Sequence, residues 1–213
     1  MSIERKFIKD GIMLTEISEY LKKQFTRADY SHIEVQKTPL GTRIVVYANK
    51  PGIIIGKSGK QIKDVTAYLQ AKFNLDNPQI DVKTIANPDM DAQIVARQMA
   101  TSIERGFNHK RIANLTLKRV MDAGAVGVAL RLAGKLGGEK SRFEKFSTGY
   151  VQHSGETSER LVLKGFAEAS LRGGKVGIQV RIMTAMSNED KIPKEKKSKE
   201  LEADQKPASD GKL

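Results

Sequence analysis

The sequence lacks cysteine and tryptophan, and tyrosine and phenylalanine make up only 6% of its 213 residues. Without cysteine, disulfides and thiolate metal sites are excluded. The three histidines, His32, His109 and His153, are too far apart in sequence for the close spacings typical of zinc ligands. We therefore expect no metal and no cofactor, and the absence of disulfides fits a reducing cytoplasm.

Long apolar runs are missing as well. No stretch approaches the roughly 20 apolar residues of a membrane-spanning helix. The first residues, MSIERKFIKD, carry charges where a secretory signal has its apolar block. We predict a soluble protein that is not exported. Its length and its hydrophobic content of 39% predict two small domains with their own cores.

Positive charge is abundant and unevenly placed. The formal net charge is +12, yet residues 187–213 hold 7 lysines and 7 acidic residues and contribute none of it. Residues 105–145 hold 10 basic and 3 acidic residues, more than half of the excess in about a fifth of the chain. This concentration favours a nucleic-acid partner over a basic face that is merely solvated.

Apolar spacing predicts an α-β-β-α-loop-α-β order for residues 1–86. The apolar residues of the first and last helices recur at three-to-four spacing, and those of the strands alternate. A turn at Pro39 to Gly41 joins the first two strands, and Pro51 opens a very short helix. The expected ranges are a helix at 10–25, strands at 32–37 and 42–48, a helix at 60–73 and a strand at 80–85.

A second α/β unit is predicted for residues 87–186. Asp89 is the expected N-cap of a helix that runs to about residue 107. A second helix at 110–123 is followed by Gly124 as its C-cap. Four strands at 126–132, 143–152, 160–167 and 176–183 and a helical turn at 169–172 complete the unit. Residues 187–213 have nearly no aliphatic side chains, so a disordered charged tail is expected.

The segment Gly56-Lys57-Ser58-Gly59 is the first candidate binding site. Its Gly-Lys-Ser is not a P-loop, because only three residues separate Gly52 from Gly56 and all three are isoleucines that favour burial. The two glycines allow a tight turn between helices and close approach of a polynucleotide backbone. Lys57, Ser58, Lys60 and Lys63 would surround one phosphate track at a helix N-terminus. The plainer alternative is a solvated glycine-rich turn.

A basic helix face is the second candidate. Lys110, Asn114 and Lys118 recur every four residues, with Arg111 beside them, on the side opposite the apolar stripe. Aromatic stacking partners are scarce, since Tyr47 and Tyr150 fall inside expected strands, so we do not expect sequence-specific base recognition.

Several short segments together resemble a known family. The N-terminal unit resembles a type II KH domain, and residues 7–184 resemble the S-three protein of the small ribosomal subunit in its archaeal or eukaryotic-like form. The carrying segments are Lys6 to Ile12, Gly56 to Gly59, Asp122 to Gly127, Gly134 to Gly138, His153 to Gly155 and Val176 to Ile182. The resemblance implies an α+β fold, a KH domain followed by a four-stranded α/β domain.

The resemblance also implies a function in translation. Members are structural constituents of the small-subunit head, bound to ribosomal RNA and to neighbouring head proteins, at the opening where messenger RNA enters. In bacterial members a basic patch is associated with unwinding messenger RNA. Its first two positions match Lys110 and Arg111, whereas Asn114 stands at the third and supplies no charge. Lys118 is one turn further on.

A glycine-rich hairpin is the last predicted contact. Lys135, Lys140 and Arg142 resemble the family's loop and would suit ribosomal RNA, although a flexible solvated hairpin is the alternative. Arg131 alternates outward from its strand and either extends this basic surface or forms a cross-strand ion pair.

Two other functions compete with this one. A free KH protein that regulates other RNAs would explain the loop and leave the second domain unexplained. A lyase acting on damaged DNA through a lysine amine would need a desolvated lysine, and no catalytic arrangement is visible in the sequence. We therefore predict a protein that is not an enzyme.

Overall fold

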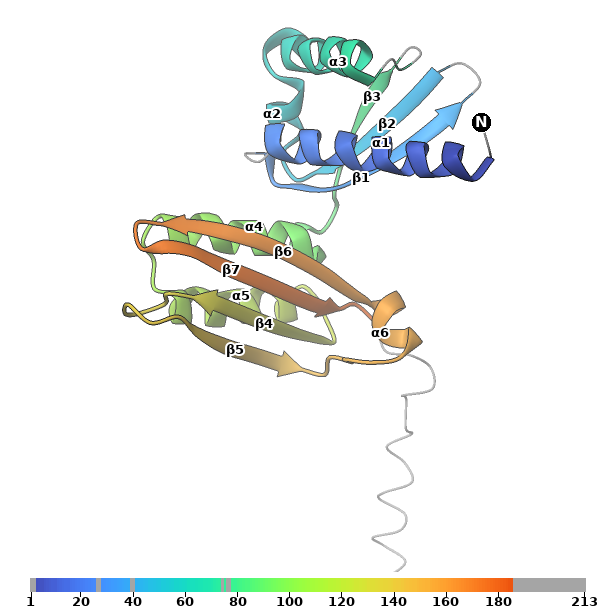
Figure 1. Cartoon of the computed structure of the whole chain (residues 1–213). Coiled ribbons are helices and arrows are strands. Elements are labelled where there is room, and N and C mark those ends of the chain that lie inside the picture. The colour runs from blue at the N-terminus through green and yellow to red at the C-terminus, as the bar shows by residue number, and fades with distance from the viewer. Residues whose placement is uncertain (1–2, 26–27, 39–40, 74, 76–77, 186–213) are drawn as a thin grey trace, which may run out of the picture.

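Two β-sheets, each with helices, form the protein, and the predicted α+β fold is confirmed (Figure 1). The structure is a computed structural model, and it describes residues 3–25, 28–38, 41–73, 75 and 78–185. The predicted turn residues Pro39 and Leu40 and the predicted tail lie outside the described residues. We propose residues 1–86 and 87–186 as the two domains; β3 ends just before this division and the turn η3 begins just after it.

The N-terminal unit is a three-stranded sheet covered on one face by helices. Strands β1 and β2 are antiparallel, and β3 adds to β2 in parallel. The apolar faces of α1 and α3 meet the sheet around the fully buried Ile17, Leu21, Ile44 and Leu69. The elements are α1 Ile3–Gln24, β1 Tyr30–Thr38, β2 Gly41–Ala48, α2 Pro51–Ile55, the 3₁₀ turn η2 Lys57–Gly59, α3 Lys60–Phe73 and β3 Gln79–Thr84.

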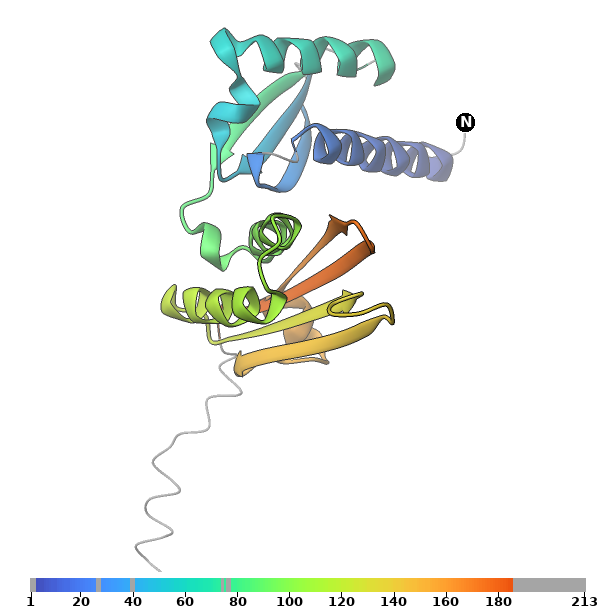
Figure 2. The ribbon, with the colours of Figure 1, turned by 90° about the vertical axis from the view of Figure 1, so that its left-hand side faces the viewer.

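The second unit is a four-stranded antiparallel sheet with two helices on one face. The strand order is β5-β4-β7-β6, and α4 and α5 lie behind the sheet in Figure 1. The other face of the sheet is open, as the turned view of Figure 2 also shows. The elements are η3 Pro88–Met90, α4 Ala92–Glu104, α5 His109–Asp122, β4 Gly127–Gly134, β5 Arg142–Gly149, α6 Glu156–Leu161, β6 Val162–Leu171 and β7 Gly174–Met183.

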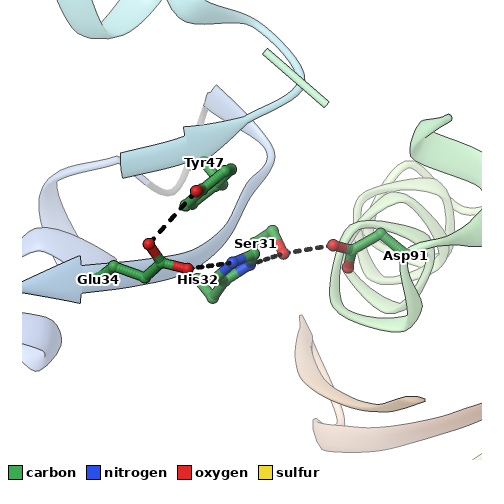
Figure 3. Close-up of polar contacts among 5 residues, drawn as sticks. All are labelled: Ser31, His32, Glu34, Tyr47 and Asp91. Carbon is green, nitrogen blue, oxygen red and sulfur yellow. Dashed lines mark hydrogen bonds and ion pairs between the residues drawn. The ribbon is translucent and has the colours of Figure 1, made fainter. Parts of the chain in front are cut away.

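The N-cap of α4 is Asp91, so the prediction of Asp89 was wrong. Asp89 lies in the 3₁₀ turn η3, whereas the Asp91 carboxylate accepts hydrogen bonds from the Gln93 and Ile94 amides at 2.9 and 3.2 Å. The hydroxyl of Ser31 on β1 donates to the same carboxylate (Figure 3). Asp91 therefore caps a helix of the second unit and ties it to the sheet of the first.

Several other elements differ from the prediction, and helix α1 begins at Ile3 instead of residue 10. Helix α6 was not expected, β5 ends at Gly149 rather than 152, and residues 169–171 belong to β6 instead of a helical turn. The β6–β7 hairpin pairs without interruption from Val162 with Met183 to Leu171 with Gly174, and this ladder overrides the local helix preference. The C-cap of α5 is Ala123, with Gly124 following it at φ 98°.

Candidate nucleic-acid interface

The predicted loop is a single turn that joins two helices. Helix α2 ends at Ile55, residues Lys57–Gly59 form a 3₁₀ turn, and α3 begins at Lys60. The turn is closed by hydrogen bonds from the Gly56 amide to the Gly52 carbonyl at 3.0 Å and from the Gly59 amide to the Gly56 carbonyl at 3.5 Å. The N-terminal end of α3, with its positive dipole, therefore opens onto this turn.

The two glycines of the turn serve different purposes. Gly56 has φ 69° and Gly59 has φ 72°, both in the left-handed region that favours glycine. A Cβ on Gly56 would lie 2.9 Å from Cγ of Gln61, so this glycine fits against the protein itself. A Cβ on Gly59 would meet nothing within 4 Å. Gly59 consequently leaves open space for something outside the protein.

The lysines of the turn are exposed along a shallow groove. Lys57, Lys60 and Lys63 are all exposed. The groove has a volume of about 610 Å³ and is lined by Gly52, Ile53, Gly56, Lys57, Lys60, Gln61 and Asp64. The side chain of Ser58 lies outside the described part of the chain. Asp64 is the acidic member of the lining, so the positive end of the groove is at the turn. This arrangement can hold a phosphate by amides and two ammonium groups.

The isoleucines before the turn are not all buried. Ile54 is fully buried in the first core, but Ile53 and Ile55 are about two-fifths exposed, so the expectation that the three favour burial was wrong for two of them. A helix of five residues packs only one side against the sheet, so the neighbours of Ile54 point outward.

The basic helix face is present as a single exposed surface on α5. Lys110, Arg111, Asn114 and Lys118 are all exposed. The helix start is held from two sides: the Asn108 side chain accepts from the Lys110 amide at 2.9 Å, and Lys110 Nζ lies 3.7 Å from Glu144 of β5. Nε2 of His109 lies 3.3 Å from the same carboxylate but forms no hydrogen bond with it.

The position of these cations is electrostatically unfavourable for the helix alone. Lys110 and Arg111 lie in the first turn of α5, which contains no acidic residue. The N-terminal end of a helix is its positive end, so cations there oppose the dipole by some tenths of a kcal/mol each. An anionic ligand at this end would remove that conflict.

A groove between the two units connects their basic surfaces. Its volume is about 560 Å³, and Lys50, which leads into α2, lies across it from Arg105, Arg111 and Arg119. Lys50 Nζ pairs with Asp29 at 3.0 Å, and Arg119 donates to Gln98 Oε1 at 3.2 Å. Arg119 also lies 3.9 Å from Asp89, so ion pairs compensate part of the positive charge between the start of α2 and α5.

Arg131 does not belong to this surface. Leu130 and Leu132 are buried toward α4 and α5, so Arg131 points from the opposite face of the sheet. Its register partner on β5 is Lys145, which removes the predicted alternative of an ion pair with that neighbour. The Arg131 guanidinium lies instead 5.3 Å from the ring centre of Phe143, which is 60% exposed.

Sequence reasoning missed Phe143 as a candidate aromatic. It considered Tyr47 and Tyr150, but Tyr47 stacks on His32 with ring centres 4.3 Å apart (Figure 3), and Tyr150 follows β5 instead of lying in it. Phe143 was predicted only as the first residue of a strand, with no role of its own. The edge position of β5 leaves its ring uncovered.

The cations of the glycine-rich hairpin are exposed between β4 and β5. Lys135, Lys140 and Arg142 all lie on the surface of this connection, and Leu136 packs against the second core beneath them. Gly134 has φ 150°, and a Cβ on it would lie 3.0 Å from the backbone of Lys175 and Val176, so only glycine fits where the connection leaves the sheet.

The described ranges offer neither a metal site nor a membrane span. These residues contain no group of three or more His, Asp or Glu side chains placed to hold a metal ion. None of the described helices is long and apolar enough to span a bilayer.

Comparison with known proteins agrees with this geometry. The family model "KH domain" matches residues 16–89, and the model "Ribosomal protein S3, C-terminal domain" matches residues 99–182. The turn at 56–59 lies in the first match, and α5 and the open sheet face lie in the second. Both parts of the predicted resemblance are confirmed.

Curated relatives extend the likeness over most of the chain. The Small ribosomal subunit protein uS3 of Methanocaldococcus jannaschii is 48% identical over 181 residues, covering 85% of this chain and 87% of that protein. The protein of the same name from Methanococcus aeolicus is 49% identical with the same coverage. That of Methanocorpusculum labreanum is 42% identical over 183 residues, covering 86% and 79%. The chain therefore belongs to the uS3 family of small ribosomal subunit proteins.

Proposed function

We propose that this protein is a structural constituent of the small-subunit head that holds ribosomal RNA with the turn at Gly56–Gly59 and lines the opening where messenger RNA enters with α5. It acts by binding, without a catalytic step or a cofactor. Its partners are ribosomal RNA, messenger RNA and neighbouring head proteins. The observation that carries the proposal is the exposed, cationic turn at the N-terminus of α3, with open space over Gly59.

The turn suits a phosphate backbone better than a base. Amides, Lys57 and Lys60 supply donors and charge but no flat apolar surface for stacking. A glycine without a neighbour within 4 Å lets the sugar-phosphate chain approach the protein backbone closely. KH domains clamp about four nucleotides at such a turn. We therefore assign the turn an anchoring role rather than sequence recognition.

Helix α5 suits a messenger RNA strand that moves past it. Its exposed side chains include two cations in the first turn, the amide of Asn114 and a further cation at Lys118. Contacts of this kind attract phosphates without selecting a sequence, which a surface along the messenger RNA path requires. Because Asn114 supplies no charge, Lys118 carries the third positive position here. The hairpin cations Lys135, Lys140 and Arg142 add contacts to ribosomal RNA.

A tethered cleavage probe tests both assignments. The chain has no cysteine, so one introduced cysteine gives a single attachment point for an iron chelate that generates hydroxyl radicals. A probe at Asp64→Cys, beside the turn, is expected to cleave ribosomal RNA in assembled subunits at one cluster of nucleotides. A probe at Lys118→Cys is expected to cleave bound messenger RNA.

The control is Arg160→Cys, an exposed position on α6. Ribosomal RNA cleavage from position 64 that does not exceed the control would overturn the role of the turn. Messenger RNA left intact by the probe at position 118 would overturn the role of α5 and leave that of the turn standing.

A further inference from the structure

The open face of the second sheet carries an unusual set of side chains. Successive residues of each strand alternate between the face packed on α4 and α5 and the open face seen in Figure 1. The outward side chains of the middle and edge strands include Phe143, Lys145, Arg131, Gln179, Arg181, Lys164 and Phe166. We call these seven residues the open face.

Like charges lie directly opposite each other on this face. Arg131 pairs in register with Lys145 across β4 and β5, and Lys164 pairs with Arg181 across β6 and β7. Like charges in opposed positions destabilise a sheet. Glu168 is the one acidic side chain that the described strands place on this side, and it already pairs with Lys175 at 3.0 Å. Four cations are thus held together without a matching set of acids.

The two phenylalanines are available for stacking. Phe143 is 60% and Phe166 52% exposed. The Arg131 guanidinium and Lys145 Nζ lie 5.3 and 5.8 Å from the Phe143 ring centre, so both cations interact with the ring, which is still more than half exposed. An edge strand could bury such rings against a neighbour, yet both are uncovered here.

The floor between the rings is flat. In the register row of Phe143, the next outward positions are Ala133, Gly177 and Glu168. Phe166 lies in the neighbouring row, and a Cβ on Gly177 would lie 3.7 Å from its ring. Strands β5 and β6 are three spacings apart, roughly 14 Å. Such a span accommodates a few unstacked nucleotides.

A small hollow on this face is lined by three of its cations. Its volume is about 220 Å³, and Arg131, Lys145, Arg181, Gln179 and His153 line it. Nη1 of Arg181 lies 3.3 Å from Nδ1 of His153. Three cations and two further polar groups around this volume suit a phosphate group.

We infer that the open face binds a short single-stranded segment of RNA, with bases stacked on Phe143 and Phe166 and phosphates along the two like-charged pairs. The inference rests on the proposed function in taking RNA as the partner. It assigns this RNA to the side of the sheet remote from α5, with residues that the proposed function does not use. Paired bases of a duplex would hide their faces from the rings, so the segment is unpaired.

Charge and aromaticity together favour RNA over an acidic peptide. Carboxylates would neutralise the four cations but would leave both rings in water. A nucleotide supplies the anion and the flat ring in one unit, and stacking on an aromatic side chain tolerates any base. The acidic peptide is therefore an outcome to be excluded by experiment.

Binding of a fluorescent ten-nucleotide oligouridine to the full chain tests the inference. Phe143→Leu keeps an apolar side chain and removes the ring, so its Kd is expected to rise by about 5- to 100-fold, the range for one stacked base. Phe7→Leu, at a phenylalanine on α1 that is 73% exposed, serves as the control and is expected to change Kd by less than about twofold.

A second variant keeps the test independent of the ring. Arg131→Gln with Lys145→Gln relieves the repulsion between these two cations, so the melting temperature is expected to stay or rise. The slope of log K against log salt is nevertheless expected to become shallower by about 0.7 for each phosphate that the variant no longer neutralises. Arg5→Gln, an exposed arginine on α1, is the charge control.

All variants are measured with and without the double change Lys57→Asp and Ser58→Asp. If that double change leaves binding unaltered while Phe143→Leu weakens it, the role of the turn fails and the open face stands. Wild-type affinity of Phe143→Leu in both backgrounds overturns the open face. So does a ten-residue oligoglutamate that binds as tightly as the RNA and is weakened equally by Phe143→Leu.

Discussion

Substitution of Gly59 separates what the turn needs for folding from what it needs for its ligand. The residue has φ 72°, and nothing lies within 4 Å of where its Cβ would be. Gly59→Ala therefore meets no clash in the free protein and experiences only the backbone cost. Gly59→Asn adds a longer side chain, but asparagine tolerates left-handed backbone.

The magnitudes decide the sign of the stability change. A left-handed backbone costs a residue other than glycine about 1–2 kcal/mol. Loss of unfolded-state freedom on replacing glycine returns about 0.4–1 kcal/mol. The net loss for Gly59→Ala is about 1 kcal/mol, which corresponds to a fall of roughly 2–4 °C in melting temperature. Gly59→Asn is expected to recover about half of that loss.

The two variants are expected to differ in stability but not in RNA affinity. Either side chain fills the space that the ligand backbone would occupy, so both variants are expected to weaken RNA binding on the order of tenfold, equivalent to about 1.4 kcal/mol. Thermal unfolding measures the first quantity, and anisotropy with labelled single-stranded RNA measures the second. Gly56→Ala is the comparison variant, because its Cβ would meet Gln61 of the protein instead of open space.

One result would refute this reasoning. If Gly59→Asn recovered stability and also bound RNA with wild-type affinity, close approach of a ligand would not be the reason for glycine at this position. A variant that lost stability and affinity in the same proportion would point in the same direction, since partial unfolding alone would explain it.

Three further predictions concern the fold. Asp91→Ala removes the N-cap of α4 and is expected to cost about 1–2 kcal/mol in urea unfolding, whereas Asp89→Ala, outside the cap, is expected to cost less than about 0.5 kcal/mol. Gly165→Ala would place a Cβ 2.1 Å from a backbone oxygen of α4 and is expected to cost roughly 3 kcal/mol or more, compared with near-neutral Gly137→Ala, which meets nothing within 4 Å. Burial raises the pKa of Tyr30 above its unfolded pKa of about 10. Its stabilising contribution is therefore complete below the unfolded pKa and is lost as pH rises through the folded pKa. Tyr30→Phe should flatten the resulting alkaline decline in melting temperature.

Local patterns in the sequence predicted most of the architecture. The three-to-four spacing around Leu21 and Leu69 and the alternation in both sheets identified the longer helices and all seven strands, because these elements each bury one face. Family membership confirms the ribosome of the cytoplasm as the location and a structural role instead of an enzymatic one. Helix α6 was missed, since six residues carry too little periodicity to be recognised.

The candidate site was only partly predictable, for reasons of tertiary geometry. The turn at Gly56–Gly59 is continuous in sequence, so its residues could be identified directly. The pairing of Arg131 with Lys145 depends on strand register, and the exposure of Phe143 depends on which strand lies at the edge. Neither property is encoded by neighbours in the chain. Sequence reasoning accordingly left Arg131 between the basic surface of the glycine-rich hairpin and a cross-strand ion pair, and missed its contact with Phe143.

Competition for assembly tests the central claim most directly. The charge reversal Lys57→Asp with Ser58→Asp places anions at the N-terminal end of α3, where the helix dipole favours them, so folding should be unharmed or slightly improved. Wild-type and variant chains with different tags are produced together, and their ratio is measured in purified small subunits and in the unbound fraction. The account predicts that the variant is depleted from subunits and accumulates unbound with an unchanged melting temperature. Equal incorporation of the two chains would contradict it.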